Sequence, residues 1–96
     1  MFIVLLKLAE NKEKASQFME AHKEWVGRGY QDGVFLLHGG LHPNLGGGIL
    51  AYNTTTEELQ DRVNKDPFVA NKVAVAEIME LHPAGADERL EFLIAN

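Results

Sequence analysis

Apolar residues along this chain gather in four short runs that favour β-strands. The runs cover residues 2–8, 34–38, 49–52 and 73–82, and most of their side chains are β-branched or bulky. Such side chains are typical of strands because they pack well on a pleated, half-buried surface. Residues 39–48, between the second and third runs, are rich in glycine and include a proline, so we interpret them as a loop.

A longer segment, residues 11–31, carries the spacing of an amphipathic helix. Its apolar and small positions recur every three or four residues, which places them along one face of a helix. They are Ala15, Phe18, Met19, Trp25, Val26 and Gly29. His22 falls on the same stripe, so we expect its side chain to face the sheet.

A second helix is predicted after the third strand. Thr55 and Glu58 have the spacing of a capping box, in which the threonine caps the start of the helix. This helix ends before Asp66, because the proline at position 67 disfavours helical geometry in the residue that precedes it.

The order of these elements predicts an α+β fold of the ferredoxin-like βαββαβ type. With right-handed crossovers this order gives a four-stranded antiparallel sheet with both helices on one face. A further amphipathic helix is predicted over residues 87–95. A chain of 96 residues is short for two domains. We therefore expect a single domain, 1–96, with a core in residues 1–83 and a C-terminal helical extension in residues 84–96.

Apolar residues also occupy the sheet face that the helices would leave open. In the first strand Ile3 and Leu5 lie on the face opposite Phe2, Val4, Leu6 and Leu8. In the last strand one face carries Val73, Val75, Met79 and Leu81, and the other carries Ala74, Ala76 and Ile78. An open apolar face of this extent favours association. We therefore predict a homodimer that forms through the sheet face.

Composition narrows the range of partners. Nine Lys and Arg against 14 Asp and Glu give a net charge of -5, with no basic cluster. Nucleic acids and anionic membranes need a concentrated positive surface, so we expect neither as a partner. The absence of cysteine excludes disulfides, thiolate metal sites and a cysteine nucleophile. Lys7 interrupts the apolar start, so we expect no signal peptide or membrane span, and a cytoplasmic location.

Two residues are the strongest candidates for catalysis. His22 lies on an otherwise apolar stripe, where it is either a core-edge histidine satisfied by one hydrogen bond or a functional group in a pocket wall. Asp66 precedes Pro67 and Phe68, so we expect it to cap the turn that follows. One carboxylate oxygen can cap the turn while the other orients an imidazole. A His–Asp pair of this kind suits proton transfer near neutral pH.

The glycine-rich segment and the remaining histidines are weaker candidates. Residues 38–48 lack the motifs of a Walker A loop and of a dinucleotide-binding turn, although their N–H groups can hold an anion. A metal site of His22, His38 and His42 is an alternative, but this spacing matches no standard pattern on one element. His82 is interpreted as structural. We therefore predict no metal and no cofactor.

Several segments, in the right order, resemble the YciI-like (YCII-related) family. The most distinctive is Asp66-Pro67-Phe68. The others lie in residues 22–25, 34–40, 43–47, 49–51 and 77–80. The resemblance extends over roughly residues 1–83. It implies a dimeric α/β barrel, formed by two ferredoxin-like domains, with a small-molecule pocket that brings His22 close to Asp66 as a suspected catalytic dyad.

The chain departs from the family pattern at three positions. His38 stands where serine is usual, Gly40 where proline is usual, and Asn44 where arginine is usual. Without that arginine, a carboxylate or phosphate substrate is less expected.

These observations lead to the hypothesis of a lyase or isomerase that acts on a small molecule by proton transfer. His22 would exchange the proton, Asp66 would orient the imidazole, and N–H groups of the glycine loop or His38 would hold the oxyanion. The residues expected to contact the substrate are His38, Gly39, Gly40, Trp25 and Phe68. The alternative is a non-catalytic dimer that binds a metabolite or serves as an accessory protein.

Overall fold

A computed structural model describes residues 1–94, which contain one four-stranded sheet. Its strands are β1 (Phe2–Leu8), β2 (Phe35–Leu41), β3 (Gly46–Ala51) and β4 (Ala74–Glu80). They lie in the order β2-β3-β1-β4, and every neighbouring pair is antiparallel. The predicted ferredoxin-like α+β fold is confirmed.

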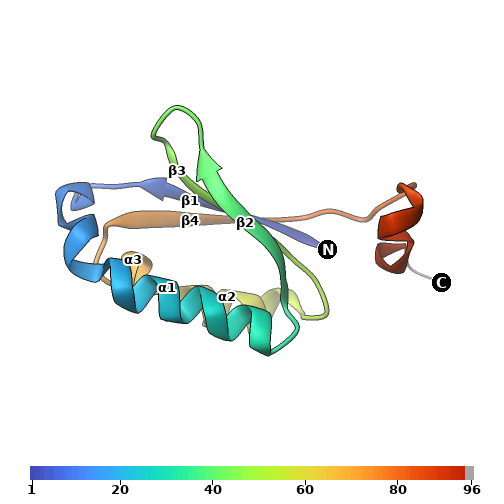
Figure 1. The fold of residues 1–96 in the computed structure, drawn as a ribbon. Coiled ribbons are helices and arrows are strands. Elements are labelled where there is room, and N and C mark those ends of the chain that lie inside the picture. The colour runs from blue at the N-terminus through green and yellow to red at the C-terminus, as the bar shows by residue number, and fades with distance from the viewer. Residues whose placement is uncertain (95–96) are drawn as a thin grey trace.

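Three α-helices lie on one face of this sheet (Figure 1). A short 3-10 helix, η1 (Lys12–Lys14), leads into α1 (Ala15–Gln31), which connects β1 to β2. α2 (Thr56–Asn64) and α3 (Pro67–Ala70) connect β3 to β4. The core lies between the helices and the sheet. Its buried residues are Phe2, Val4, Leu6, Trp25, Val26, Val34, Phe35, Ile49, Ala51, Leu59, Val63 and Ala74.

Local chemistry explains where α2 begins and why α1 lies so close to the sheet. Oγ1 of Thr55 accepts a hydrogen bond from the backbone N–H of Glu58 at 3.2 Å and donates to the carboxylate of Glu58 at 3.1 Å. Thr55 therefore caps the helix as predicted, whereas the carboxylate of Glu58 binds the threonine hydroxyl in place of the backbone N–H that a capping box uses. On α1, Gly29 faces the ring of Phe35, and a Cβ at position 29 would collide with that ring. Glycine thus allows α1 to approach β2 closely.

Residues 39–48 form a β-hairpin, so the predicted loop is wrong. β2 and β3 extend through the glycines, and only residues 42–45 make the turn. The glycines indicated a loop, but here they permit close approach between strands. At Gly46 the φ angle is 127°, and a Cβ would collide with the carbonyl oxygen of Leu6 on β1.

The face of the sheet opposite the helices is largely apolar and accessible in the described chain, and it also carries an ion pair of 3.1 Å between Lys7 and Glu77. Leu37, Val75 and Met79 are exposed by 53%, 62% and 41%. Ile3 and Leu5 alternate along β1 with residues buried under the helices, so they belong to this open face. We call these five apolar side chains the open face.

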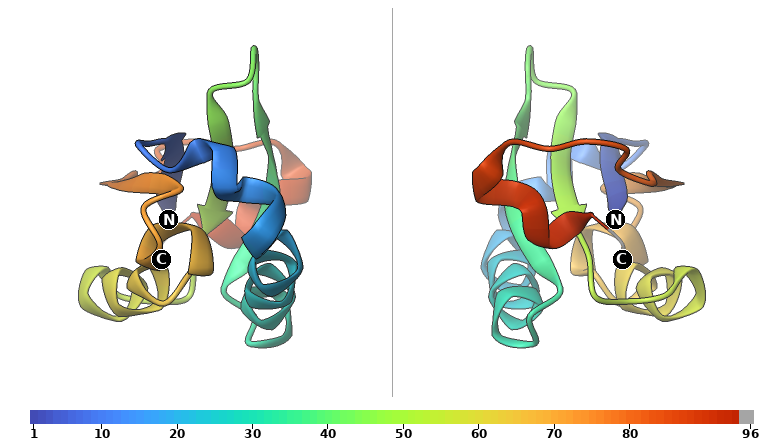
Figure 2. Two further views of the ribbon diagram at one scale, coloured as in Figure 1. Left: turned by 90° about the vertical axis from the view of Figure 1, so that its left-hand side faces the viewer. Right: turned by 90° about the vertical axis from the view of Figure 1, so that its right-hand side faces the viewer.

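The C-terminal segment forms a short 3-10 helix, η2 (Glu88–Leu93), that lies beyond the end of the sheet (Figures 1 and 2). The ring of Phe92 packs edge-on against that of Tyr52, with centroids 5.6 Å apart. The helix predicted over residues 87–95 is therefore shorter, and Ala95 lies outside the described residues. Among residues 1–94, no helix has the length and apolar character needed to cross a bilayer.

Candidate functional site

His22 on α1 and Asp66 at the start of α3 form a buried polar pair. Nδ1 of His22 lies 2.7 Å from Oδ1 of Asp66. Asp66 is fully buried, whereas 16% of the His22 side chain is exposed. An ionised carboxylate can only accept, so with Asp66 ionised Nδ1 of His22 is the donor, and in the neutral imidazole Nε2 then carries a free lone pair. Residues 44 positions apart in the sequence are thus in direct contact.

The two carboxylate oxygens of Asp66 have very different surroundings. Asp66 is the N-cap of α3, with Pro67 directly after it, and its Oδ1 also accepts from the backbone N–H of Phe68 at 3.2 Å. One oxygen therefore serves both the cap and the imidazole, rather than one oxygen each as expected. Oδ2 is buried and accepts no hydrogen bond from residues 1–94. A buried, half-satisfied carboxylate is costly, so stability alone does not explain its presence.

Aromatic rings hold the imidazole of His22 in one plane. The ring of Phe68 stacks on it with a centroid separation of 4.0 Å and an interplanar angle of 5°. The ring of Trp25 lies further away, at 5.9 Å and 26°. Together with the hydrogen bond to Asp66, this packing fixes where Nε2 points before any ligand arrives.

A cavity of about 300 Å³ opens beside His22, between α1 and the β2–β3 hairpin. We call it the glycine cavity, because Gly40 and Gly47 line it. Gly40 pairs with Gly47, and Gly47 pairs with the buried Leu6, so both glycines lie on the helix side of the sheet. Side chains at these two positions would occupy the space that a small ligand needs. The wall is otherwise mostly apolar and includes Met19.

A second cavity, of about 500 Å³, lies between α1 and β2 and shares His22 with the first. We call it the tyrosine cavity. Tyr30, His38 and Lys23 line it, and the hydroxyl of Tyr30 lies 2.7 Å from Nδ1 of His38. His22 therefore faces two hollows, one mostly apolar and one with three polar side chains.

The structure separates the five residues predicted to bind the substrate. Gly40 and Phe68 line the glycine cavity, and His38 lines the tyrosine cavity. Gly39 alternates with its neighbours on β2, so its side of the strand belongs to the open face. Trp25 is 2% exposed and lines neither cavity.

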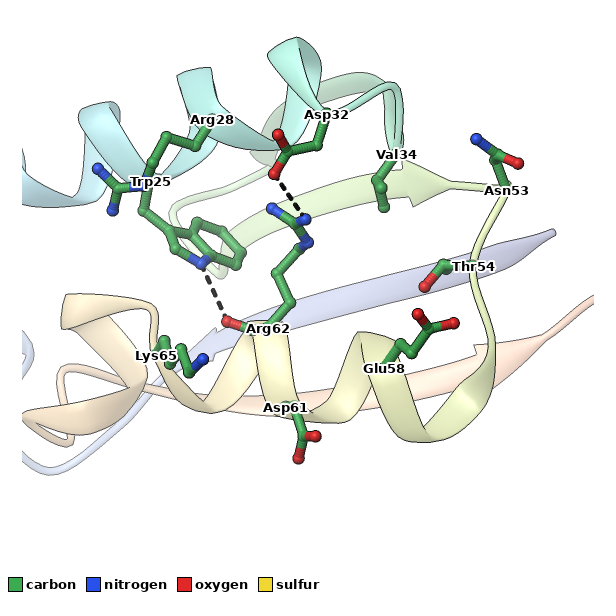
Figure 3. A pocket seen from close by; sticks show the side chains of 10 residues that line it. All are labelled: Trp25, Arg28, Asp32, Val34, Asn53, Thr54, Glu58, Asp61, Arg62 and Lys65. Carbon is green, nitrogen blue, oxygen red and sulfur yellow. Dashed lines mark hydrogen bonds and ion pairs between the residues drawn. The ribbon is translucent and has the colours of Figure 1, made fainter.

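Trp25 lines a different, polar cleft of about 480 Å³ between α1 and α2 (Figure 3). Its Nε1 donates to the backbone oxygen of Arg62 at 3.0 Å, and the guanidinium of Arg62 lies 2.8 Å from the carboxylate of Asp32. Arg28, Arg62 and Lys65 are balanced there by Asp32, Glu58 and Asp61. The positive charges that line the cleft are thus balanced by negative charges that line it too.

His42 and His82 do not line either cavity with His22. His42 lies in the hairpin turn, and Nε2 of His82 lies 2.9 Å from the carboxylate of Glu80. Within residues 1–94 no group of three or more metal-binding side chains gathers. The three-histidine alternative therefore has no geometric support in the described chain.

Tyr30 is the residue of this region that the sequence interpretation missed. It follows His22 by eight positions on α1, so residues 22, 26 and 30 share one helix face. That spacing was available in the sequence, but a single tyrosine near a helix end gave no reason to pair it with His38. The two residues come together only because α1 packs against β2.

The geometry at His22 is suited to moving a proton. A neutral imidazole whose Nδ1–H is held by a buried carboxylate offers Nε2 as a base, and the carboxylate stabilises the imidazolium that forms. The adjacent cavities together fall within the size range of small-molecule sites.

The fold is also that of a known enzyme. The structure of 5-chloro-2-hydroxyhydroquinone dehydrochlorinase (TftG) from Burkholderia phenoliruptrix AC1100, in complex with 2,5-dihydroxybenzoquinone, matches this chain with a TM-score of 0.68. The match covers 86% of this chain and 96% of that chain, at 11% sequence identity. At this identity the likeness shows the fold alone. No family model and no curated protein sequence matches the chain.

Proposed function

We propose that this protein is a small-molecule enzyme of the lyase or isomerase type that works by proton transfer. Nε2 of His22 removes a proton from the substrate, and Asp66 orients the imidazole and stabilises its charged form. The observation that carries this proposal is the 2.7 Å contact between His22 and the fully buried Asp66, beside two cavities.

The cavity walls favour a small, compact substrate with an apolar body. The glycine cavity is lined mainly by apolar side chains and glycine, with Asn44 as a polar side chain besides His22, whereas Lys23, Tyr30 and His38 line the tyrosine cavity. Arginine, the side chain best suited to grip a carboxylate or phosphate, lines neither cavity. The dehydrochlorinase of the same fold acts on a chlorinated, hydroxylated ring compound. We extend the proposal to an oxygenated ring or ketone and to membership of the YciI-like family.

Exchange of carbon-bound hydrogen with solvent deuterium tests this function without knowledge of the product. Small ketones, lactones and hydroxylated quinones are incubated with the protein in D2O, and deuterium uptake is followed by NMR. We expect at least one compound to exchange faster with the protein. His22→Gln should slow that exchange about a hundredfold, the usual size of a general-base contribution.

His82→Gln is the matched control, because His82 is an exposed histidine that pairs with Glu80 and lines neither cavity. It should leave the exchange rate unchanged. If no compound exchanges but 2,5-dihydroxybenzoquinone binds in a His22-dependent way, the protein is a metabolite-binding protein and the enzyme proposal is wrong.

We also propose that two copies pair through the open face. Its exposed leucine, valine and methionine side chains provide the apolar surface that such an interface buries. Light scattering should give the mass of two chains, and Leu37→Lys should reduce it to one. Leu45→Lys, at an equally exposed leucine in the hairpin turn, should leave the dimer intact. A single-chain mass for the unmodified protein well above micromolar concentration would contradict the dimer.

A further inference from the structure

The contact between Tyr30 and His38 gives the tyrosine cavity a chemistry of its own. The hydroxyl oxygen of Tyr30 lies 2.7 Å from Nδ1 of His38, and the two rings meet edge-on with centroids 5.6 Å apart. Both side chains are exposed, so a ligand in the cavity can reach them. His38 comes from β2 and His22 from α1, and both line this cavity.

The hydrogen-bond partners of the two Nδ1 atoms place the ring proton on different nitrogens in the two histidines. Nδ1 of His22 faces a carboxylate, which only accepts, so the ring proton of His22 is on Nδ1. Nδ1 of His38 faces a phenol, which is a better donor than acceptor, so Tyr30 donates to it. The ring proton of His38 is then on Nε2. One cavity thus contains a histidine that can accept a proton and a histidine that can donate a hydrogen bond.

We propose that His38 is a second catalytic residue, whose Nε2–H donates to the carbonyl oxygen of a substrate while His22 removes a proton from the neighbouring carbon. This inference rests on the proposed function and narrows its substrate to a small carbonyl compound with a hydrogen on the carbon next to the carbonyl. Tyr30 is a positioning residue that fixes the ring of His38. Lys23, on the same wall, adds positive charge near the developing oxyanion.

The step balances within the protein and its substrate. The carbon–hydrogen bond breaks, and its proton moves to Nε2 of His22, which becomes an imidazolium paired with Asp66. The electron pair of that bond forms a carbon–carbon double bond, and the carbonyl π pair moves to oxygen. The resulting enolate oxygen accepts the hydrogen bond from His38, which keeps its proton. Return of the proton to the other face of the same carbon, or to the far carbon of a substrate with a conjugated second double bond, re-forms the carbonyl and gives an isomer. Where the next carbon carries a leaving group, the oxygen pair re-forms the carbonyl, the carbon–carbon π pair shifts to the next bond, and the group departs with its own electron pair, which gives an elimination.

Nitrogen NMR tests the two tautomers directly. In the uniformly 15N-labelled protein, long-range correlation spectra at a pH where the imidazoles are neutral show which ring nitrogen carries hydrogen. We expect Nδ1–H for His22 and Nε2–H for His38. Tyr30→Phe should move the Nδ1 resonance of His38, because it removes the hydrogen bond, and should leave His22 unchanged. An Nδ1–H form of His38, or no response to Tyr30→Phe, would overturn the proposal.

A pair of substitutions at position 38 tests the donor itself. The amide of glutamine reaches the place of imidazole Nε2, whereas that of asparagine reaches the place of Nδ1. The probe is 4-nitrophenolate, a small aromatic oxyanion that resembles the enolate, and its affinity is measured by calorimetry. We expect His38→Gln to bind it nearly as well as the unmodified protein and His38→Asn about tenfold more weakly, the value of one hydrogen bond to a charged group.

Equal affinity of the two variants would contradict a donor at Nε2. The outcomes also separate this inference from the proposed function. His22→Gln should slow deuterium exchange about a hundredfold, yet in that background the preference of 4-nitrophenolate for glutamine over asparagine at position 38 should persist, because it depends on the donor at position 38 and not on the base. Discrimination between His38→Gln and His38→Asn without any deuterium exchange in the unmodified protein would establish the oxyanion site and reject the proton-transfer function.

Discussion

Two acid–base pairs join the helices of this domain, and they have nearly the same length. His22 and Asp66 lie 2.7 Å apart, and Arg62 and Asp32 lie 2.8 Å apart. Their surroundings differ. The side chains of the first pair are 16% and 0% exposed, whereas those of the second are 24% and 55% exposed. The two pairs therefore differ in burial and not in distance.

The difference lies in what each pair leaves unsatisfied. Water can solvate the free oxygen of Asp32, so the pair with Arg62 costs little and contributes little. Oδ2 of Asp66 is buried without a partner in the described chain, and Nε2 of His22 is available to a ligand. A protein tolerates such a cost where the group has a task. This contrast leads to predictions for each pair.

The largest effect on stability is expected from Asp66→Ala. The substitution removes the cap of α3 and leaves the imidazole of His22 without its buried partner. We expect the free energy of unfolding to fall by about 3 kcal/mol, from the loss of a cap and of a buried charged hydrogen bond. Urea denaturation at fixed protein concentration measures it. A loss below about 1 kcal/mol would mean that the pair is energetically no different from a surface pair.

A smaller effect, on activity and not on stability, is expected from Gly40→Val. A Cβ at position 40 meets only the backbone oxygen of Gly46, at 3.9 Å, so the strand can hold the larger residue. The valine fills the glycine cavity, and deuterium exchange should slow at least about tenfold, because a misplaced substrate loses its alignment. The free energy of unfolding should stay within about 1 kcal/mol of the unmodified value.

Gly39→Val is the matched control for this prediction. Position 39 lies on the same strand but on the opposite side of the sheet, and a Cβ there has no atom within 4 Å. Because position 39 lies on the proposed dimer face, light scattering first checks that the mass is unchanged, and exchange should then continue at the original rate. Equal loss of activity in both variants would show that the strand, and not the cavity, is what the valine disturbs.

The smallest effect is expected from Asp32→Ala. This change breaks the exposed pair with Arg62, and the free energy of unfolding should fall by less than about 1 kcal/mol. Because the remaining effect is electrostatic, it should shrink further in high salt. A loss as large as that of Asp66→Ala would remove the contrast between the two pairs.

Most of the fold could be predicted from the sequence because its signals agree with one another. β-branched runs, the stripe on α1, the Thr55–Glu58 capping box and the proline after Asp66 all favour the observed elements. The error at residues 39–48 arose because glycine has two uses: it forms turns, and it permits close strand contacts. Only the structure shows that Gly40 and Gly47 pair across a hairpin and leave a cavity.

The candidate site was predictable only in part. The resemblance around Asp66-Pro67-Phe68 pointed to a partner for His22, since no local pattern links residues 44 positions apart. The shared use of Oδ1, with Oδ2 unpaired, depends on side-chain geometry that no sequence pattern encodes. The Tyr30–His38 contact depends on how α1 lies against β2, which hydrophobic spacing fixes only coarsely.

The same substitution in the two pairs tests the central claim most directly. Asp66→Asn and Asp32→Asn each remove one charge and little volume, and asparagine remains a good helix cap at position 66. In the deuterium-exchange assay we expect Asp66→Asn to lower the rate about a hundredfold, because the imidazolium of His22 loses its counter-charge. Asp32→Asn should leave the rate unchanged. Equal rates for the two variants would contradict a catalytic role for the His22–Asp66 pair.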